Sequence, residues 1–275
     1  MLTTGLLGFA IGVTMALTGA GGGILGVPAL VFGLRLTVAQ AGPVALFAVS
    51  LAAALGATLG LRAGVVRYRA AGFIALVGMI ASPVGLWAAS RVPNGPLAGI
   101  FGLVLGWVAL QMLRRGAAPS EGGDPQPVPG RKSPPCVRSP RTGRFVWTRP
   151  CTLALAACGL LAGLLSGLLG VGGGFVIVPM LTRISDLPMR SIVATSLAVI
   201  MLVSASGVVY ATLGGSMQWN IALPFAGGAV AGMLGGRVVA NRITGHHLQQ
   251  VFACVAAFVA LAMLYKSATV LFGAQ

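Results

Sequence analysis

The chain contains apolar stretches that are too long and too poor in charge to belong to a soluble domain. A helix needs about 20 apolar residues to cross a hydrocarbon core ~30 Å thick, and several stretches reach that length. Only 8% of the 275 residues are charged, and the mean hydropathy is +0.95. The sequence therefore predicts an all-α polytopic membrane protein with about eight transmembrane helices. The eight stretches are residues 5–33, 39–61, 70–90, 96–113, 153–181, 189–213, 221–240 and 248–272.

A shift of 151 residues superposes one half of the sequence on the other without a gap. Within residues 19–30, seven of twelve positions are identical to their partners, and further matches follow at Gly56/Gly207 and Arg91/Arg242. Shared hydrophobic composition alone would give identities at roughly one position in ten. The chain is therefore a duplication, with transmembrane repeats at residues 1–115 and 151–275, each contributing four predicted spans.

Residues 116–150 join the repeats and are rich in Pro, Gly, Ser and Arg, which is typical of a disordered linker. Eight of the 18 Lys and Arg residues lie between Arg114 and Arg149. Because Lys and Arg accumulate on the cytoplasmic side of membrane proteins, the linker is expected to be cytoplasmic. With four crossings in each half, both termini are expected there too. The net charge of +15 is then a topological signal and does not indicate a nucleic-acid partner.

The first stretch of each half is too long for a single crossing, and a glycine run divides it. We expect the first helix of each half to be broken there. An unwound backbone persists in a membrane only inside protein or beside water, and a helix N-terminus at the break favours an anion. Interrupted helices at matched positions of two halves point to a transporter's binding site. The alternative is close helix packing by small residues.

The candidate substrate-binding residues of these two elements are Gly19, Gly21, Gly22, Gly23, Pro28, Gly170, Gly172, Gly173, Gly174 and Pro179. Beyond each glycine run, the second piece of the stretch either completes the crossing or returns to the side from which it came. That choice decides whether the halves are parallel or inverted.

Hydroxyl side chains are embedded in the sixth stretch, at Thr195, Ser196, Ser204 and Ser206. Thr195 and Ser196 are candidate substrate-binding residues, because they lie near the beginning of a predicted helix. Such hydroxyls can equally bond to their own backbone. The matching residues in the first half are Val44 and Ala45, so a hydroxyl site would be asymmetric.

The spans contain no acidic residue, since the only three in the chain are Glu121, Asp124 and Asp186. A proton-coupled carrier usually needs a titratable group within the membrane. Enzymes are disfavoured for the same reason, and no cofactor or metal site is expected. The cysteines have neither C-x-x-C nor nearby His, and we expect thiols with no disulfide framework. They are Cys136, Cys151, Cys158 and Cys254.

These residues resemble the TauE/SafE family of sulfite-exporter-like permeases. The resemblance rests on G-x-G-G-G with a downstream Val-Pro in both halves, on the stretch ATSLAVI from Ala194, and on the four-plus-four layout. It implies an inner-membrane permease for small anions, typically sulfite, sulfonates or related sulfur compounds. By motif, the glycines and prolines named above, with Thr195 and Ser196, would line the path. The chain departs from the family at residues 42–45, where a Thr-Ser pair is common.

The function expected from the sequence is export of a small anion through the bacterial-type cytoplasmic membrane. The partners are the anion and the lipid bilayer, and a homo-oligomer is compatible with this interpretation. Without a buried carboxylate, the membrane potential is the candidate driving force, worth about 2.3 kcal/mol per charge at 100 mV. Two alternatives are an importer of another small solute and a non-transporting membrane scaffold subunit. The first stretch has no Lys or Arg before it, so a retained span is expected and not a cleaved signal peptide.

Overall fold

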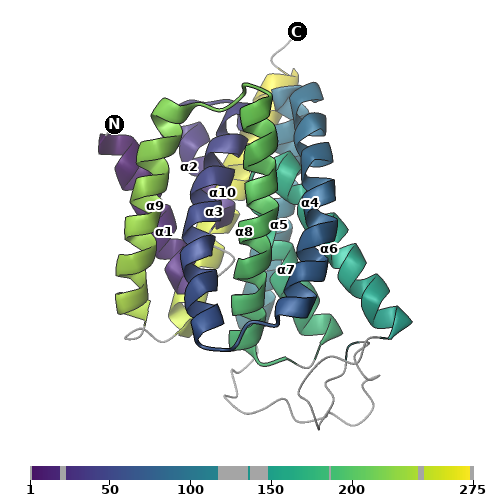
Figure 1. Cartoon of the computed structure of the whole chain (residues 1–275). Coiled ribbons are helices and arrows are strands. Elements are labelled where there is room, and N and C mark those ends of the chain that lie inside the picture. Colours follow the sequence, from purple (N-terminus) through teal and green to yellow (C-terminus); the bar gives the residue numbers. More distant parts are fainter. Residues whose placement is uncertain are drawn as a thin grey trace.

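The computed structural model describes residues 2–18, 23–116, 136, 148–185, 187–240 and 245–272 (Figure 1). These residues form ten α-helices and no strand. The helices of the first half are α1 (Leu2–Thr18), α2 (Gly26–Gly33), α3 (Val38–Arg62), α4 (Tyr68–Arg91) and α5 (Asn94–Gly116). Those of the second half are α6 (Arg149–Leu169), α7 (Gly174–Ile184), α8 (Met189–Leu213), α9 (Trp219–Ala240) and α10 (Gly245–Phe272). The linker predicted at residues 116–150 falls almost entirely outside the described residues.

The fold is the predicted all-α membrane bundle, and the first helix of each half is broken at its glycine run. The stretch 5–33 forms α1 and α2, and the stretch 153–181 forms α6 and α7. Each of the other six stretches forms one helix. Of the described helices, α3, α4, α6 and α8 are long and apolar enough to cross a membrane by length and composition.

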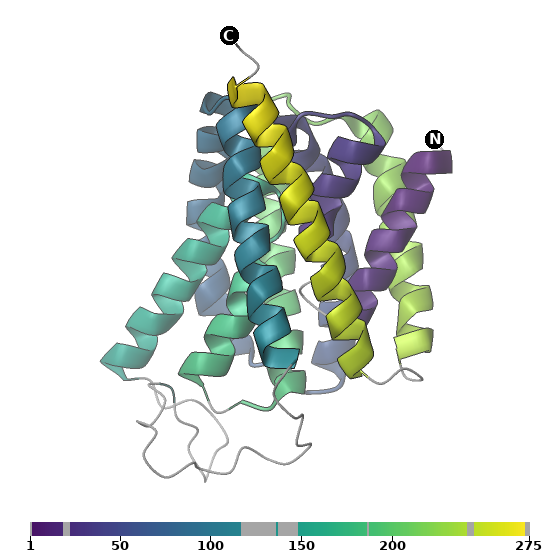
Figure 2. The same ribbon diagram turned by 180° about the vertical axis from the view of Figure 1, so that it is seen from behind.

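The second piece of each broken helix returns to the end of the bundle from which the first piece came. In Figures 1 and 2, α1 enters from the end marked N and C, and α2 leads back to that end. At the opposite end, where α5 ends, α6 enters and α7 returns. We call these pairs the first hairpin and the second hairpin. Because they enter from opposite ends, the two halves are inverted relative to each other.

The prediction that the linker and both termini share one side of the membrane rests on four crossings in each half. It assumed that the first stretch of each half crosses the membrane. The hairpins return to the end from which they came, whereas α3, α4 and α5 of the first half and α8, α9 and α10 of the second run between the two ends (Figures 1 and 2). The beginning of α1 and the end of α5 therefore lie at opposite ends of the bundle. We call the two ends of the bundle the terminus end and the linker end.

The halves exchange helices, since α1 packs against α9 and α6 packs against α4. At the centre, α3 packs against α8, and the Ser50 hydroxyl donates a hydrogen bond to the Met201 carbonyl oxygen at 3.2 Å. These two residues are 151 apart, which is the shift that superposes the repeats. A contact between a residue and its own repeat partner lies on a two-fold axis. Ser50 and Met201 therefore mark the pseudo-two-fold axis that relates the halves.

Glycines allow α1 and α9 to approach backbone to backbone, as small residues do in membranes. A β-carbon added at Gly8 would overlap the carbonyl of Phe225, and one added at Gly228 would overlap the carbonyl of Gly5. The same contact recurs between α4 and α6, where a β-carbon at Gly163 would overlap Gly78. For the glycines that meet a neighbouring backbone in this way, close packing is the interpretation that the contacts support.

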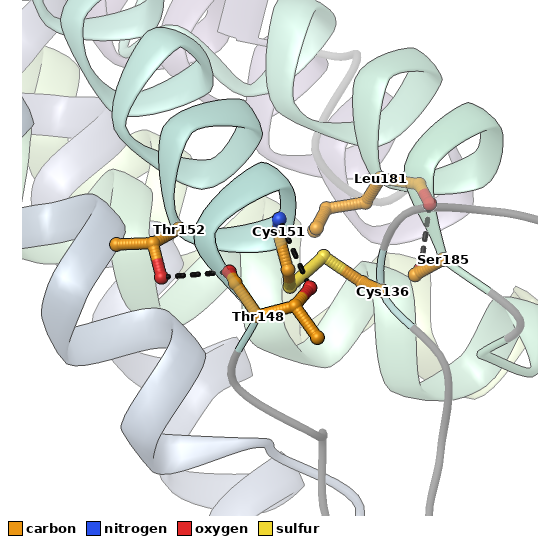
Figure 3. Close-up of a disulfide and its surroundings, with 6 residues drawn as sticks. All are labelled: Cys136, Thr148, Cys151, Thr152, Leu181 and Ser185. Carbon is orange, nitrogen blue, oxygen red and sulfur yellow. Dashed lines mark hydrogen bonds between the residues drawn. A yellow bond between two sulfur atoms is a disulfide. The ribbon is translucent and has the colours of Figure 1, made fainter.

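A disulfide joins Cys136 to Cys151 with an S–S distance of 2.00 Å (Figure 3). The expectation of unpaired thiols is wrong for this pair, while Cys158 and Cys254 are free. The pairing depends on a tertiary contact, because the Cys136 amide donates to the Ile184 carbonyl at 3.0 Å at the end of α7. Cys151 lies in the first turn of α6, which Thr148 caps by accepting from the Cys151 amide at 3.4 Å. The disulfide thus fixes one residue of the linker to the base of the second hairpin.

Gly228→Ala should destabilise the protein, because the added methyl group would force α1 away from α9. Overpacking of this kind typically costs about 1–3 kcal/mol, or a fall in Tm of roughly 2–4 °C per kcal/mol. Gly227→Ala is the matched control, since a β-carbon there meets nothing within 4 Å. Thermal unfolding of both variants in detergent measures the difference. Equal Tm values would contradict the close contact between α1 and α9.

Candidate functional site

The tips of the two hairpins meet at the pseudo-two-fold axis. A β-carbon added at Gly23, in the turn before α2, would lie 3.1 Å from the Val171 carbonyl oxygen and 3.2 Å from a methyl group of Val49. One added at Gly172 would lie 2.7 Å from the other Val49 methyl group and 3.0 Å from a methyl group of Ile200. Val49 and Ile200 are repeat partners and precede the axis residues directly. Both tips are therefore packed at the centre of the bundle.

The second glycine run reverses the chain through a left-handed backbone. Gly170, Gly172 and Gly173 have φ values of +70°, +79° and +69°, a region that L-residues with side chains disfavour. Gly170 ends α6, and its amide donates to the Ser166 carbonyl at 2.8 Å. Gly173 is the N-cap of α7, so that Gly174 is the first residue of that helix. Of the first run only Gly23 is described, and Gly19, Gly21 and Gly22 lie outside the described residues.

The N-terminus of α7 presents backbone amides that have no acceptor within the helix. The first i→i−4 hydrogen bond of α7 runs from the Ile177 amide to the Gly173 carbonyl at 3.2 Å. The amides of Gly174 and Phe175 come before this bond. Their positive partial charge, reinforced by the helix dipole, favours an anion.

The two candidate prolines lie within the returning helices, away from the hairpin tips. Pro28 is buried in the first turn of α2, where a missing amide removes no helical hydrogen bond. Pro179 is half-buried in the interior of α7. The structure does not bring either proline to the contact between the tips, and it brings Gly23 and Gly172 there instead.

Thr195 and Ser196 are buried in the first third of α8, near the linker end of that helix. The Thr195 hydroxyl accepts from the Arg67 amide at 3.1 Å, which secures the residue that precedes α4. The Ser196 hydroxyl donates to the Val193 carbonyl at 2.8 Å within its own helix. Both hydroxyls therefore have protein partners, and Thr195 has a structural contact that the sequence did not suggest.

Three other hydroxyls are fully buried and have no hydrogen-bond partner among the described residues. They belong to Ser82 in α4, Ser166 in α6 and Ser204 in α8. Neither Ser82 nor Ser166 was a candidate from the sequence, although one sequence signal could have found them. The repeat partners of the three serines, in the order given above, are the apolar residues Met233, Met15 and Ala53. A polar residue in a span that faces an apolar repeat partner marks a position where the symmetry is broken.

A cavity of about 410 Å³ lies at the terminus end between α3, α4 and the connection from α8 to α9. Its polar lining includes Gln40, Ser90, Ser216 and Gln218. Deeper in the bundle, a small apolar cluster is built from one residue of each helix. These residues are Leu46, Leu86 and Ala211. From the terminus end inward, α3, α4 and α8 line the cavity and then form the apolar cluster. Further along, α4 and α8 contain the unpartnered hydroxyls of Ser82 and Ser204.

Comparison with known proteins connects this geometry to membrane transport. The sequence model of the family described as sulfite exporter TauE/SafE matches residues 4–263. A probable membrane transporter protein of Xylella fastidiosa (strain 9a5c) is 29% identical over 267 residues, which are 96% of this chain and 93% of the relative. The probable membrane transporter protein YunE of Bacillus subtilis (strain 168) is 24% identical over 271 residues, or 95% of this chain and 96% of YunE. No solved structure matches the chain.

Thr195→Val should lower the Tm, because it removes the acceptor of the Arg67 amide without changing the shape of the side chain. An unpaired buried amide costs about 1–3 kcal/mol. Thr195→Ser keeps the acceptor and should retain most of the stability. Melting curves in detergent, with anion flux measured in parallel, separate structure from binding. A Thr195→Val variant that melts normally but loses flux would instead place Thr195 at the substrate.

Proposed function

The chain belongs to the sulfite exporter TauE/SafE family and is a membrane transporter, not an enzyme, and on this premise we propose that it exports small anions. The proposed substrates are sulfite, sulfonates and related sulfur-containing organic anions, and the proposed location is a bacterial-type cytoplasmic membrane. One observation carries the proposal: two re-entrant hairpins, one from each inverted half, meet at the axis marked by Ser50 and Met201.

This arrangement suits a carrier. In inverted-repeat transporters the substrate site lies near the midplane, where broken helices direct their termini at the substrate. Here the amides of Gly174 and Phe175 lie at such a break, inside the protein, where irregular backbone is tolerated. Two inverted halves can also adopt two arrangements of equivalent packing, which open the site to either side in turn.

The membrane potential is the proposed driving force. The three acidic residues of the chain lie in the linker and between α7 and α8, so no carboxylate is available within a helix to carry a proton. With the cytoplasm negative, each negative charge that leaves releases about 2.3 kcal/mol at 100 mV. Export of a divalent anion releases roughly twice as much.

The distribution of cations supports a cytoplasmic linker end, with both termini outside. Three of the 18 Lys and Arg residues belong to helix ends or connections at the terminus end, namely Arg35, Arg91 and Lys266. The other 15 belong to helix ends and connections at the linker end. Four crossings per half would place 12 of the 18 cations inside and six outside, so the imbalance found here is larger. Four crossings would place Arg183, Arg190, Arg237 and Arg242 outside, whereas here they belong to the linker end.

The disulfide argues for the opposite orientation, since disulfides persist in oxidising compartments. We give the cations precedence because their imbalance recurs in every connection at the linker end. A reducing cytoplasm would keep Cys136 and Cys151 as adjacent thiols without altering the helices. The orientation is therefore proposed from charge.

A scaffold subunit is the rival function, and glycine substitution does not separate it from a carrier. Alanine at Gly172 or Gly173 would strain a left-handed backbone and collide with Val49 or Ala162. Such variants would lose assembly whether or not the protein transports anything. Flux of the unmodified protein is the decisive measurement.

Purified protein in liposomes should transport radiolabelled sulfite in proportion to a potential set by potassium and valinomycin. Sulfonates should compete with it, because the site is proposed to recognise the shared oxyanion group. Collapse of the proton gradient alone, with the potential clamped, should leave the flux unchanged. Loss of flux in that condition would refute potential-driven export, and absence of flux for every anion would favour the scaffold.

Alkaline phosphatase fused after Gln275 should be active, because that enzyme folds only outside the cytoplasm. A fluorescent protein inserted in the linker after Glu121 should fluoresce, because it folds inside. The reciprocal fusions serve as controls and should be inactive. An active phosphatase in the linker would reverse the proposed orientation.

A further inference from the structure

We propose that the hydroxyls of Ser82, Ser166 and Ser204, with the first amides of α7, form one oxyanion-binding site. We call it the serine site. It rests on the proposed function, because it defines where in the transporter the anion binds. The site belongs to the second hairpin alone, so that the protein holds one anion between its two halves.

The three serines lie on three helices that pack against one another, and Ser204 contacts the second glycine run directly. A β-carbon at Gly172 would lie 3.0 Å from the Ser204 oxygen, so this hydroxyl is directed at the residues that precede α7. Ser166 is one turn along α6 from Ala162, on whose carbonyl and side chain Gly173 packs. Residues four apart share a helix face, so Ser166 lies on the face of α6 that meets the N-terminus of α7.

Ser82 completes the group from α4. A β-carbon at Gly207 would lie 3.1 Å from the Ser82 oxygen. Gly207 is three residues after Ser204 on α8, so the two serines approach the same side of that helix about one turn apart. The backbone of Ser82 also packs on Gly167, the residue next to Ser166.

The complete burial of these hydroxyls without a protein partner supports a ligand site here. Buried polar groups in folded proteins are nearly always hydrogen-bonded, and each exception requires an explanation. The buried hydroxyls of Ser185, Ser196 and Ser267 follow the rule, since each donates to a backbone carbonyl at 2.6–2.8 Å. The hydroxyls of Ser82, Ser166 and Ser204 are exceptions to this rule. A single bound group that reached each of them would satisfy all three.

The chemistry of the site selects an anion. Serine hydroxyls can donate or accept, but the amides of Gly174 and Phe175 only donate, and the dipole of α7 repels a cation. None of the described helices contains an acidic residue, so nothing negatively charged in them competes with the ligand. Hydroxyl and amide donors that converge from several directions match an oxyanion, whose oxygens accept from each of them.

The first hairpin cannot form an equivalent site. The repeat partners of the three serines are Met15, Met233 and Ala53, none of which donates a hydrogen bond. The hydroxyl donors of the second half therefore have no side-chain counterparts at the matching positions. A single asymmetric site is therefore expected, with a stoichiometry of one anion per chain.

The cavity at the terminus end offers a route by which an anion could reach the serine site. The cavity near Gln40 and Gln218 is followed by the apolar cluster, in which Leu86 lies one turn from Ser82 on the same face of α4. Leu46 of the cluster packs on Gly207, beside the Ser82 hydroxyl. Leu46, Leu86 and Ala211 therefore lie between the polar lining of this cavity and the Ser82 hydroxyl.

Alanine substitution of each serine tests the site, with Ser206→Ala as the matched control. Ser206 lies on the same helix as Ser204, but its hydroxyl already donates to the Val203 carbonyl at 2.8 Å. The measurements are the rise in Tm caused by sulfite or methanesulfonate in detergent, at constant ionic strength, and sulfite flux in liposomes. We expect both anions to raise the Tm of wild type and of Ser206→Ala. Each of Ser82→Ala, Ser166→Ala and Ser204→Ala should lose that rise and at least tenfold in flux.

The same variants should melt no lower than wild type without anion, because each removes a buried hydroxyl that has no partner. A variant that fails to melt cooperatively is replaced by Ser→Cys, which keeps the volume and weakens the donor. If all three variants respond to anions as Ser206→Ala does, the serine site is wrong and the proposed function stands. If wild type shows neither a Tm rise nor flux, the proposed function fails and the site fails with it.

Discussion

Backbone contact between the two halves is the interaction on which the rest of the structure depends. Gly228 on α9 and Gly163 on α6 allow their helices to touch α1 and α4 without an intervening side chain. Since α1 and α6 are the outer arms of the hairpins, each hairpin is held by a helix of the other half. Neither half can therefore position its own glycine run alone. The meeting of the two tips at Ser50 and Met201 is a consequence of this exchange.

Local signals in the sequence predicted the helices and the position of the breaks. The length of the apolar stretches and the glycine runs act within about ten residues, so that no tertiary information was needed. The direction of α2 and α7 was different. It determines whether a half crosses the membrane three or four times, and it depends on which helix receives the returning piece. The pairing of Cys136 with Cys151 likewise depends on the contact of Cys136 with Ile184.

The position of the break in each half was predicted, whereas the choice of substrate-binding residues stays a prediction. Gly172 and Gly173 lie at the break that the glycine run predicted and have a left-handed backbone, and Gly23 lies at the tip of its hairpin. Thr195 was chosen for its place near a helix beginning, but it bonds to Arg67, 128 residues away. Ser82 and Ser166 appeared unremarkable because a serine in a span usually bonds to its own helix. Only the packing of α4, α6 and α8 leaves their hydroxyls without partners.

The glycine contact between α4 and α6 also has a mechanical consequence. These two helices touch backbone to backbone, so Ser82 and Ser166 would move together, whereas Ser204 lies on α8. Sliding α8 against the joined pair would move one hydroxyl away from the other two. An ion held by all three would then be released by a shift of a few ångströms, with no change in the charge of any group. The affinity for the ion would therefore be set directly by the position of α8 relative to α4 and α6.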